Sequence, residues 1–220
     1  MPTRSPVADS TRARLLTAAS AEFSARGFDG AKVDRIAATA RVNKAMLYYH
    51  FRSKAGLYHE ILRELFDSLA VAVETARAGG GEPEEQLRRY IRAIAARAAE
   101  RPDFPGIWLR ELADGGRHLD PGVMLMLKRV LAVLTGILGD GQRAGVFGEA
   151  HPLVIQISIV SPLLFLSATA AVRERVSAAV PQLTHVTREM AVAHVESATL
   201  AALRASARPT DARRSQRGRS

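Results

Sequence analysis

The apolar positions between residues 33 and 40 repeat with the spacing of a short α-helix. They are Val33, Ile36, Ala37 and Ala40. Because this i, i+3, i+4, i+7 spacing puts them on one face, we expect one buried stripe and a helix that ends near Arg41. Asn43 is a favourable N-cap for a second helix that begins at Lys44. Leu47 and Phe51 then lie one turn apart and are expected to point inward.

Helical periodicity continues along the rest of the chain, interrupted by glycine and proline. The expected helices cover residues 54–77, 83–100 and 104–113, a segment opened by Asp120 and Pro121 that ends near Gly145, and residues 152–173 and 182–205. Alternation of period two is nearly absent, so the sequence predicts an all-α fold. We expect a helix-turn-helix domain over residues 9–69, a helical domain over residues 70–206 and a disordered basic tail over residues 207–220.

The second helix of the pair carries the side chains that suggest a function. Those expected to face outward are Lys44, Ala45, Tyr48 and Tyr49. Tyrosine hydroxyls and the ring of His50 can donate to phosphate oxygens, and a lysine at the helix N-terminus can reach guanine in a major groove. Ser53 can cap the next helix, whose Lys54 would face the same phosphates. This arrangement is typical of a helix-turn-helix DNA reader.

Each of these residues also has a purely structural interpretation. Tyr48 alone could fill a core while its hydroxyl binds water, and His50 alone could be packed or solvated. Lys44 and Lys54 could be solvated charges. Only their combination at this spacing favours DNA binding.

The run LYYHF at residues 47–51, followed by Ser53 and Lys54, resembles the DNA-binding domain of the TetR/AcrR family of bacterial transcriptional regulators. The likeness extends upstream over residues 12–30. It implies that Tyr48, His50 and Lys54 grip phosphates, while Asn43, Lys44, Ala45, Met46 and Tyr49 face the groove, with Lys32 and Val33 also at the DNA. Ala45 and Met46 replace the commoner Gly and Thr, and Arg41 replaces a frequent turn Gly. The DNA sequence that other members of the family recognise therefore cannot be assigned to this chain.

The distribution of charge agrees with a DNA reader. Residues 1–55 hold ten Lys and Arg against four Asp and Glu, and the tail from Arg204 holds six against one, whereas the middle is slightly acidic. A genome rich in arginine codons explains the basic tail equally well. The chain has no cysteine, which excludes disulfides and thiolate metal sites and is consistent with the reducing cytoplasm.

One segment has the composition of a membrane helix. Residues 153–172 are uncharged over about the necessary length, but serines, Gln156 and Pro162 interrupt them. Residues 1–9 contain no apolar stretch of signal-peptide length. We therefore expect a cytoplasmic protein without a membrane span. Residues 153–172 are expected to form a buried helix that packs against a partner subunit.

The larger helical region contains no Gly-rich phosphate loop, zinc-binding spacing or nucleophile elbow, so we expect no catalytic residue, metal or cofactor. His185 and His194 are nine residues apart and do not form a metal-binding i, i+4 pair. Large apolar side chains could line a cavity or simply fill the core. They are Phe104, Trp108, Met124, Met126 and Phe165. The family resemblance favours a cavity for a small-molecule effector, whose identity the residues do not specify.

The last two predicted helices carry apolar faces that would suit a dimer interface. The residues are Ile155, Ile159, Leu163, Leu166, Val192, Val195, Thr199 and Ala202. Paired across two subunits, these helices would form a four-helix bundle, and two reading helices about 34 Å apart would fit successive major grooves of a pseudo-palindromic operator. We expect a homodimeric repressor that a small hydrophobic effector releases. The alternatives are an activator, or a small-molecule binding protein with a vestigial DNA-binding domain.

Overall fold

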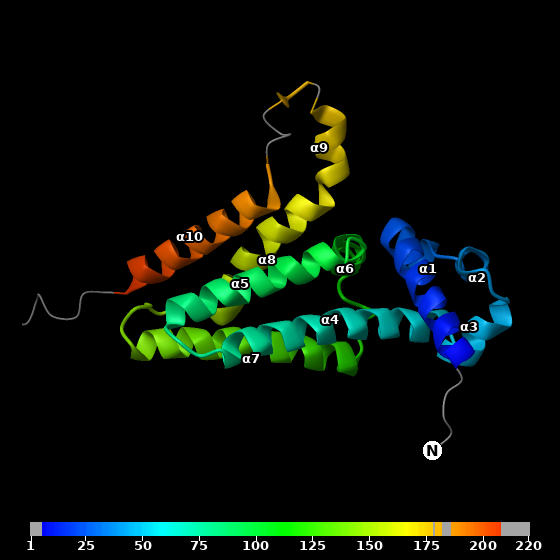
Figure 1. The fold of residues 1–220 in the computed structure, drawn as a ribbon, viewed down its shortest axis with the longest axis horizontal. Helices are drawn as coiled ribbons and strands as arrows, with labels where there is room; N and C mark the ends of the chain where they lie inside the picture. The colour runs from blue at the N-terminus through cyan, green and yellow to red at the C-terminus, as the bar shows by residue number, and fades with distance from the viewer. Residues whose placement is uncertain (1–5, 178, 182–185, 208–220) are drawn as a thin grey trace, which may run out of the picture.

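The structure is a computed structural model that describes residues 6–177, 179–181 and 186–207. Every regular element within these residues is an α-helix, which confirms the all-α prediction. A small head at one end contains α1 (Pro6–Gly30), α2 (Val33–Ala40) and α3 (Lys44–Phe51), and a longer helical body forms the rest (Figure 1). His185 and nearly all of the predicted tail lie outside the described residues.

The helices α2 and α3 form the expected helix-turn-helix, and α3 begins at the predicted residue. Arg41 ends α2 with a left-handed backbone (φ 54°), and the side chain of Asn43 accepts a hydrogen bond from the amide of Ala45 at 2.8 Å. Ile36 and Leu47 are fully buried against α1 and α4. This small core fixes the orientation of α3 within the head.

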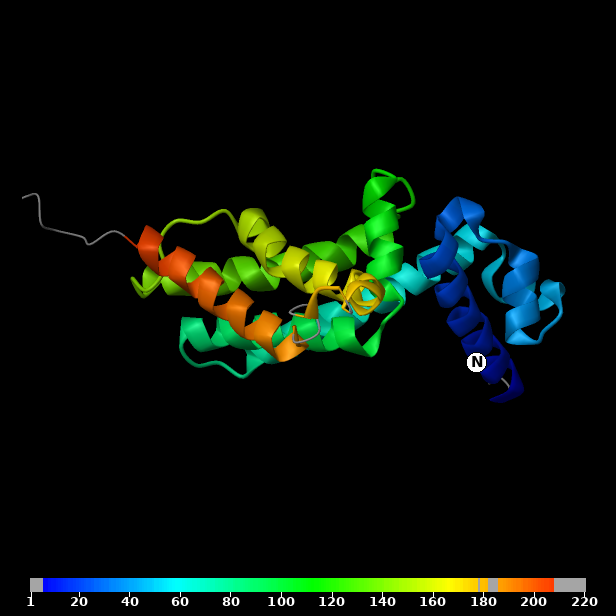
Figure 2. The same cartoon turned by 90° about the horizontal axis from the view of Figure 1, so that it is seen from above.

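The helix α4 (Lys54–Ala78) joins the head to the body without a break (Figures 1 and 2). The hydroxyl of Ser53 caps it by accepting from the amide of Gly56 at 2.9 Å, as predicted. Leu57 and Ile61 of its first half belong to the core of the head, whereas Val73 of its second half belongs to the core of the body. One continuous helix therefore contributes to both cores.

The body contains four helices besides the second half of α4. They are α5 (Pro83–Glu100), α7 (Pro121–Arg143), α8 (Pro152–Ala168) and α10 (Arg188–Ser206). The shorter α6 (Phe104–Ala113) contacts both α1 and α8, so it lies between the head and the body. Leu87, Ile91, Leu134, Ile137 and Ile159 are fully buried in the body's core. The bounds of α5 and α6 agree with the prediction.

Two helices near the C-terminus differ from the prediction. The helix expected over residues 152–173 is broken at Thr169, where α9 (Ala170–Val176) leaves α8 at 51°. The hydroxyl of Thr169 donates to the carbonyl of Phe165 at 2.7 Å, and such side-chain bonds compete with the helix backbone. The last helix begins at Arg188, because Thr187 caps it by accepting from the amide of Met190 at 3.2 Å.

Within the described residues, α7 is long and apolar enough to cross a membrane, and the bent pair α8 and α9 passes the same test when taken together. The core helix of a globular bundle passes that test equally well. Val130, Leu134 and Ile137 of α7 pack in the core of the body. Length and composition alone therefore do not indicate a membrane span.

Asp120 holds the N-terminus of α7, and Asp120→Ala is expected to lower the free energy of unfolding by about 1–2 kcal/mol at neutral pH. Its carboxylate accepts from the amide of Val123 at 2.9 Å and pairs with Arg63. Burial raises the pKa of Asp120, but these two donors outweigh burial and hold the pKa below its usual value. The carboxylate stabilises the fold above the unfolded-state pKa of about 3.9, and this contribution is lost as pH falls further.

Chemical denaturation of parent and variant at pH 7 and near pH 3 tests this prediction. The difference in stability should shrink at the lower pH. Asp120→Asn is the matched control, because asparagine is also a good N-cap and should retain most of the stability at pH 7. Equal losses for the two variants would mean that the pair with Arg63, and not the cap, stabilises α7.

Candidate nucleic-acid interface

The helix α3 is anchored on one side and exposed on the other. Leu47 and Phe51 are 0% and 7% exposed, whereas Tyr48 and Tyr49 are 46% and 76% exposed. Ala45 also lies on the exposed side. The orientation expected from the spacing is confirmed. Two phenol rings and a small residue thus form an accessible surface on a helix that the core holds in place.

Lys44 occupies the first turn of α3 beside an acidic partner. Its ammonium lies 2.8 Å from the carboxylate of Asp34 in α2, and both side chains are exposed. The hydrogen bond to Asp34 raises the pKa of Lys44, so the side chain stays charged. A contact between Lys44 and a base or phosphate requires the lysine to exchange Asp34 for DNA.

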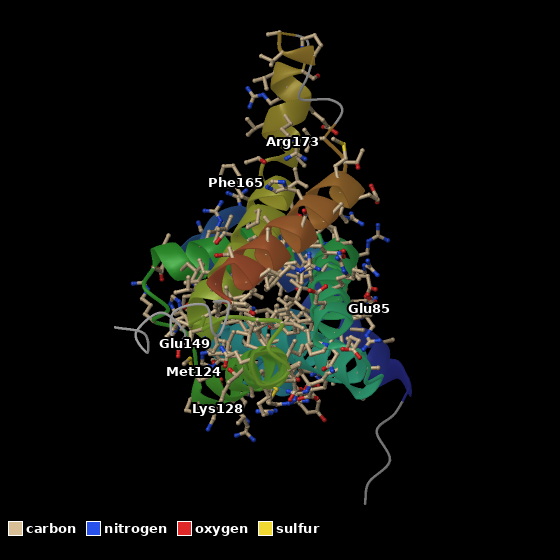
Figure 3. The ribbon with its side chains drawn as sticks, turned by 90° about the vertical axis from the view of Figure 1, so that its left-hand side faces the viewer. Glu85, Met124, Lys128, Glu149, Phe165 and Arg173 are labelled. Carbon is tan, nitrogen blue, oxygen red and sulfur yellow. The ribbon has the colours of Figure 1, made fainter. Side chains whose placement is uncertain are left out.

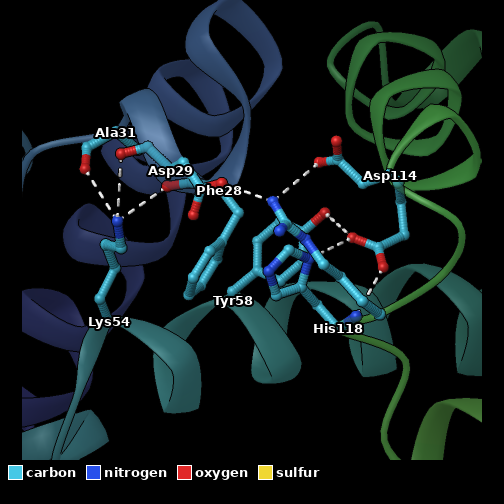
Figure 4. A network of polar contacts seen from close by, with 9 residues as sticks. Phe28, Asp29, Ala31, Lys54, Tyr58, Asp114 and His118 are labelled. Atoms are coloured by element: carbon cyan, nitrogen blue, oxygen red, sulfur yellow. Dashed lines mark hydrogen bonds and ion pairs between the residues drawn. The ribbon is translucent and has the colours of Figure 1, made fainter.

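Lys54 has a structural role inside the head. Its ammonium donates to the carbonyls of Phe28 at 2.8 Å and Ala31 at 3.2 Å, and it lies 4.5 Å from the centroid of the Phe28 ring (Figure 4). Lys54 therefore holds the end of α1 against the start of α4. Its contact with a DNA phosphate stays a prediction, and it would have to be shared with these carbonyls.

The other predicted DNA contacts surround α3 with differing exposure. Lys32 is exposed just before α2, whereas Val33, Met46 and His50 are half-buried. Met46 and Val33 pack against the core of the head. Asn43 uses its side-chain oxygen as the helix cap, so its amide nitrogen is what remains for a base or phosphate. The structure thus brings all ten predicted residues to the head and leaves their DNA contacts as predictions.

A buried polar network joins the head to the body. Glu111 of α6 is 1% exposed, and its carboxylate accepts from the hydroxyl of Tyr58 at 2.9 Å and from the backbone amide of His118 at 2.8 Å. The Nδ1 atom of His118 lies 3.0 Å from the same carboxylate, and its ring packs on Phe28 with centroids 4.1 Å apart (Figure 4). Burial and the bond to Glu111 raise the pKa of Tyr58, which therefore stays protonated and donates.

Two arginines from the same region strengthen this junction. Arg110 of α6 donates to the carbonyls of Ser24 and Ala25 at 3.1 and 3.0 Å, and Arg117 pairs with Asp29. This contact region could not be predicted, because a single glutamate in an amphipathic helix has the pattern of a solvated side chain. No sequence signal identified Glu111.

The five residues proposed to line an effector cavity are not brought together. Phe104 and Trp108 stack on each other with centroids 6.5 Å apart and meet Phe66 edge to face. Met126 is half-buried against the same cluster. Met124 and Phe165 are 51% and 67% exposed and lie in different parts of the body (Figure 3). The aromatic pair fills the junction between α4 and α6, which fits the core-filling alternative, and the cavity for an effector stays a prediction.

Most of the residues proposed for the dimer interface are buried within the chain itself. Ile155, Ile159, Leu163, Val195 and Thr199 are buried inside the chain, where α8 and α10 pack on each other and on α5. Leu166 and Val192 are half-buried, and Ala202 is exposed. The exposed face of α8 carries Leu153, Val154, Ile157 and Phe165, and that of α10 carries Met190, Ala193, Ser197 and Ala201. The two helices therefore keep an apolar outer surface, on the side opposite to the one expected.

Comparison with known proteins gives consistent matches over both parts of the chain. Residues 15–61 match the family model of bacterial regulatory proteins of the tetR family, and residues 83–195 match that of a tetracyclin repressor-like C-terminal domain. The transcriptional repressor NicS of Pseudomonas putida is 31% identical over 66% of this chain and 70% of its own length. The transcriptional repressor SCO4008 of Streptomyces coelicolor is 41% identical over 66% and 71%. A tetR-family protein from Rhodococcus, 21% identical, has the same fold, with a TM-score of 0.72 over 88% of this chain and 96% of its own.

Proposed function

This chain belongs to the TetR family of bacterial transcriptional regulators, and we propose that it is a homodimeric repressor that a small-molecule effector releases from its operator. It is a DNA-binding regulator. The observation that supports the proposal most directly is the exposed face of α3. Tyr48 and Tyr49 stand out from a helix whose opposite face is locked in the core. A rigid helix with accessible donors suits a major groove.

The proposed dimer uses the apolar outer surface of α8 and α10. Ile157 and Phe165 of α8 are 55% and 67% exposed, and Met190 of α10 is 56% exposed. An apolar surface of this kind is unfavourable in water and is covered when two copies pair about a two-fold axis. The same axis relates two reading heads, as a pseudo-palindromic operator requires.

The proposed release of DNA works through α4. This helix contributes to both cores, so an effector that shifts α4 within the body changes the separation of the two heads. A coupling free energy of about 1–3 kcal/mol alters operator affinity about 5- to 150-fold, which is enough for regulation. We place this protein in the cytoplasm, where the operator is.

An activator is the second candidate. The transcriptional activator FasR of Mycolicibacterium smegmatis is 39% identical over 39% of this chain, a stretch that also covers 39% of its own length. Transcription in vitro from the selected promoter separates the two functions, since a repressor lowers and an activator raises the amount of transcript.

Selection of genomic DNA fragments by the purified protein, followed by footprinting, tests the proposed function. A protected pseudo-palindrome supports a dimeric sequence reader, and release of that fragment by a candidate effector supports the regulatory mechanism. Enrichment of nothing beyond nonspecific DNA would contradict the proposal that the effector-free protein holds an operator.

Lys44→Ala is expected to reduce the preference for the selected duplex over a scrambled duplex by about tenfold, because one good base contact contributes about 1–3 kcal/mol of discrimination. Parallel binding titrations of both duplexes measure this ratio. Asp34→Ala is the matched comparison, since it removes the partner of Lys44 and leaves the cation in place. Equal weakening on both duplexes would assign Lys44 to a phosphate.

A further inference from the structure

Two arginines stand at the two ends of the reading helix in unusual backbone conformations. Arg41 ends α2 three residues before α3 begins, with φ 54°, and Arg52 directly follows α3, with φ 66°. Within the described residues, these are the only non-glycine residues with positive φ. Side chains with a β-carbon are strained in this region, and glycine or asparagine usually occupies it.

Neither arginine side chain is used by the fold. Both side chains are exposed, and within the described part of the chain neither guanidinium has a hydrogen-bond, ion-pair or ring partner. Other arginines of the head are engaged, such as Arg12 with Glu60 and Glu64, and Arg35 with Glu22. Strained residues whose side chains do nothing for stability are candidates for a functional role.

The length of α3 fits the place where these cations lie. Its eight residues span roughly 12 Å along the axis, which is close to the width of a B-DNA major groove. If α3 lies across that groove, a cation at each of its ends is near the phosphate backbone on that side. Guanidinium groups bind phosphate oxygens through paired N–H donors and, unlike base contacts, do not select a sequence.

We propose that Arg41 and Arg52 are a pair of phosphate clamps that seat α3 in the major groove. The proposal rests on the DNA-binding function and names contacts beyond the face formed by Tyr48 and Tyr49. It accounts for arginine at two positions where the backbone conformation favours glycine. At these positions arginine raises DNA affinity, whereas glycine would give the more stable fold.

The test is the salt dependence of binding to a random duplex and to the selected duplex. Arg41→Gly and Arg52→Gly should each lower affinity about fivefold near 0.15 M salt and reduce the slope of log K against log salt by about 0.9 per bound protomer. The preference between the two duplexes should not change, and the midpoint of thermal unfolding should stay equal or rise, since glycine relieves the strain. Arg41→Lys should restore most of the slope.

Lys128→Ala is the matched control, because Lys128 is an exposed cation of α7, outside the helix-turn-helix. It should leave the slope unaltered. An unchanged slope in the arginine variants, a lost preference between duplexes, or a lower unfolding midpoint would each overturn the clamp proposal. Because the random duplex reports phosphate contacts directly, these outcomes are distinct from a failure of repression or of effector release.

Discussion

Replacing Glu111 with alanine is expected to lower the free energy of unfolding by about 3 kcal/mol, because it leaves buried donors without an acceptor. The hydroxyl of Tyr58 and the backbone amide of His118 both point at this carboxylate. For a chain of this size, the midpoint of thermal unfolding should fall by about 6–12 °C. Scanning calorimetry or circular dichroism of the full chain measures the change.

The same substitution is expected to weaken DNA binding at temperatures where the variant is still folded. Glu111 ties α4 to the segment that holds Phe28 at the end of α1, so its loss frees the head to reorient on the body. Operator affinity should fall because fewer molecules hold the two heads at the required separation.

A double-mutant cycle with Tyr58→Phe separates the two effects. Tyr58→Phe removes one donor and should cost about 1 kcal/mol alone, but little when Glu111 is already absent. Glu149→Ala is the control for loss of a carboxylate, since Glu149 is exposed on the body (Figure 3). Additive costs in the cycle, or an unfolding midpoint equal to that of the control, would contradict a cooperative junction.

Much of the fold could be predicted because local signals and packing agree. Pro83 and the pair Asp120 and Pro121 mark helix starts by their backbone chemistry alone, and the structure places α5 and α7 there. The head was equally predictable, since Asn43 and Ser53 cap the helices that follow them. Caps and fixed backbone angles act within a few residues, so a sequence displays them directly.

The face of a helix is less predictable when apolar residues surround it. In α8, Ile155 and Ile159 form one helical stripe, and Leu153 and Ile157 form another with the same spacing. Periodicity cannot decide which stripe enters the core, because that depends on the position of α5 and α10. Five of the eight side chains proposed for the interface therefore lie in the stripes that the chain's own core covers.

In the candidate site, too, local relations could be predicted from the sequence and tertiary contacts could not. Outward orientation of Tyr48 and Tyr49 followed from the inward orientation of Leu47 and Phe51, which is a local relation. The role of Lys54 depended on carbonyl groups more than twenty residues away, at the end of α1. Contacts at such a separation in sequence are set by tertiary packing and leave no pattern around the lysine itself.

Ile157→Glu on α8 is expected to convert the proposed dimer into a monomer and to lower operator affinity by two orders of magnitude or more. Ile157 is 55% exposed, so the charge does not disturb the chain's own core. A two-fold axis brings two copies of the substitution into one interface, where each carboxylate loses water and gains no partner. A monomer carries one reading head and loses the high effective concentration that binding of the first head gives the second.

Light scattering on a sizing column gives the mass, and titration of the selected duplex gives the affinity. Met124→Glu is the matched control, because Met124 is similarly exposed on α7, away from the outer surface of α8 and α10 (Figure 3). Unfolding midpoints equal to that of the parent would show that both variants are folded. If Ile157→Glu stays dimeric, the subunits meet through another face. If it is monomeric but binds DNA as tightly as the parent, the two heads are not coupled by dimerisation, and the proposed route from α4 to operator release fails as well.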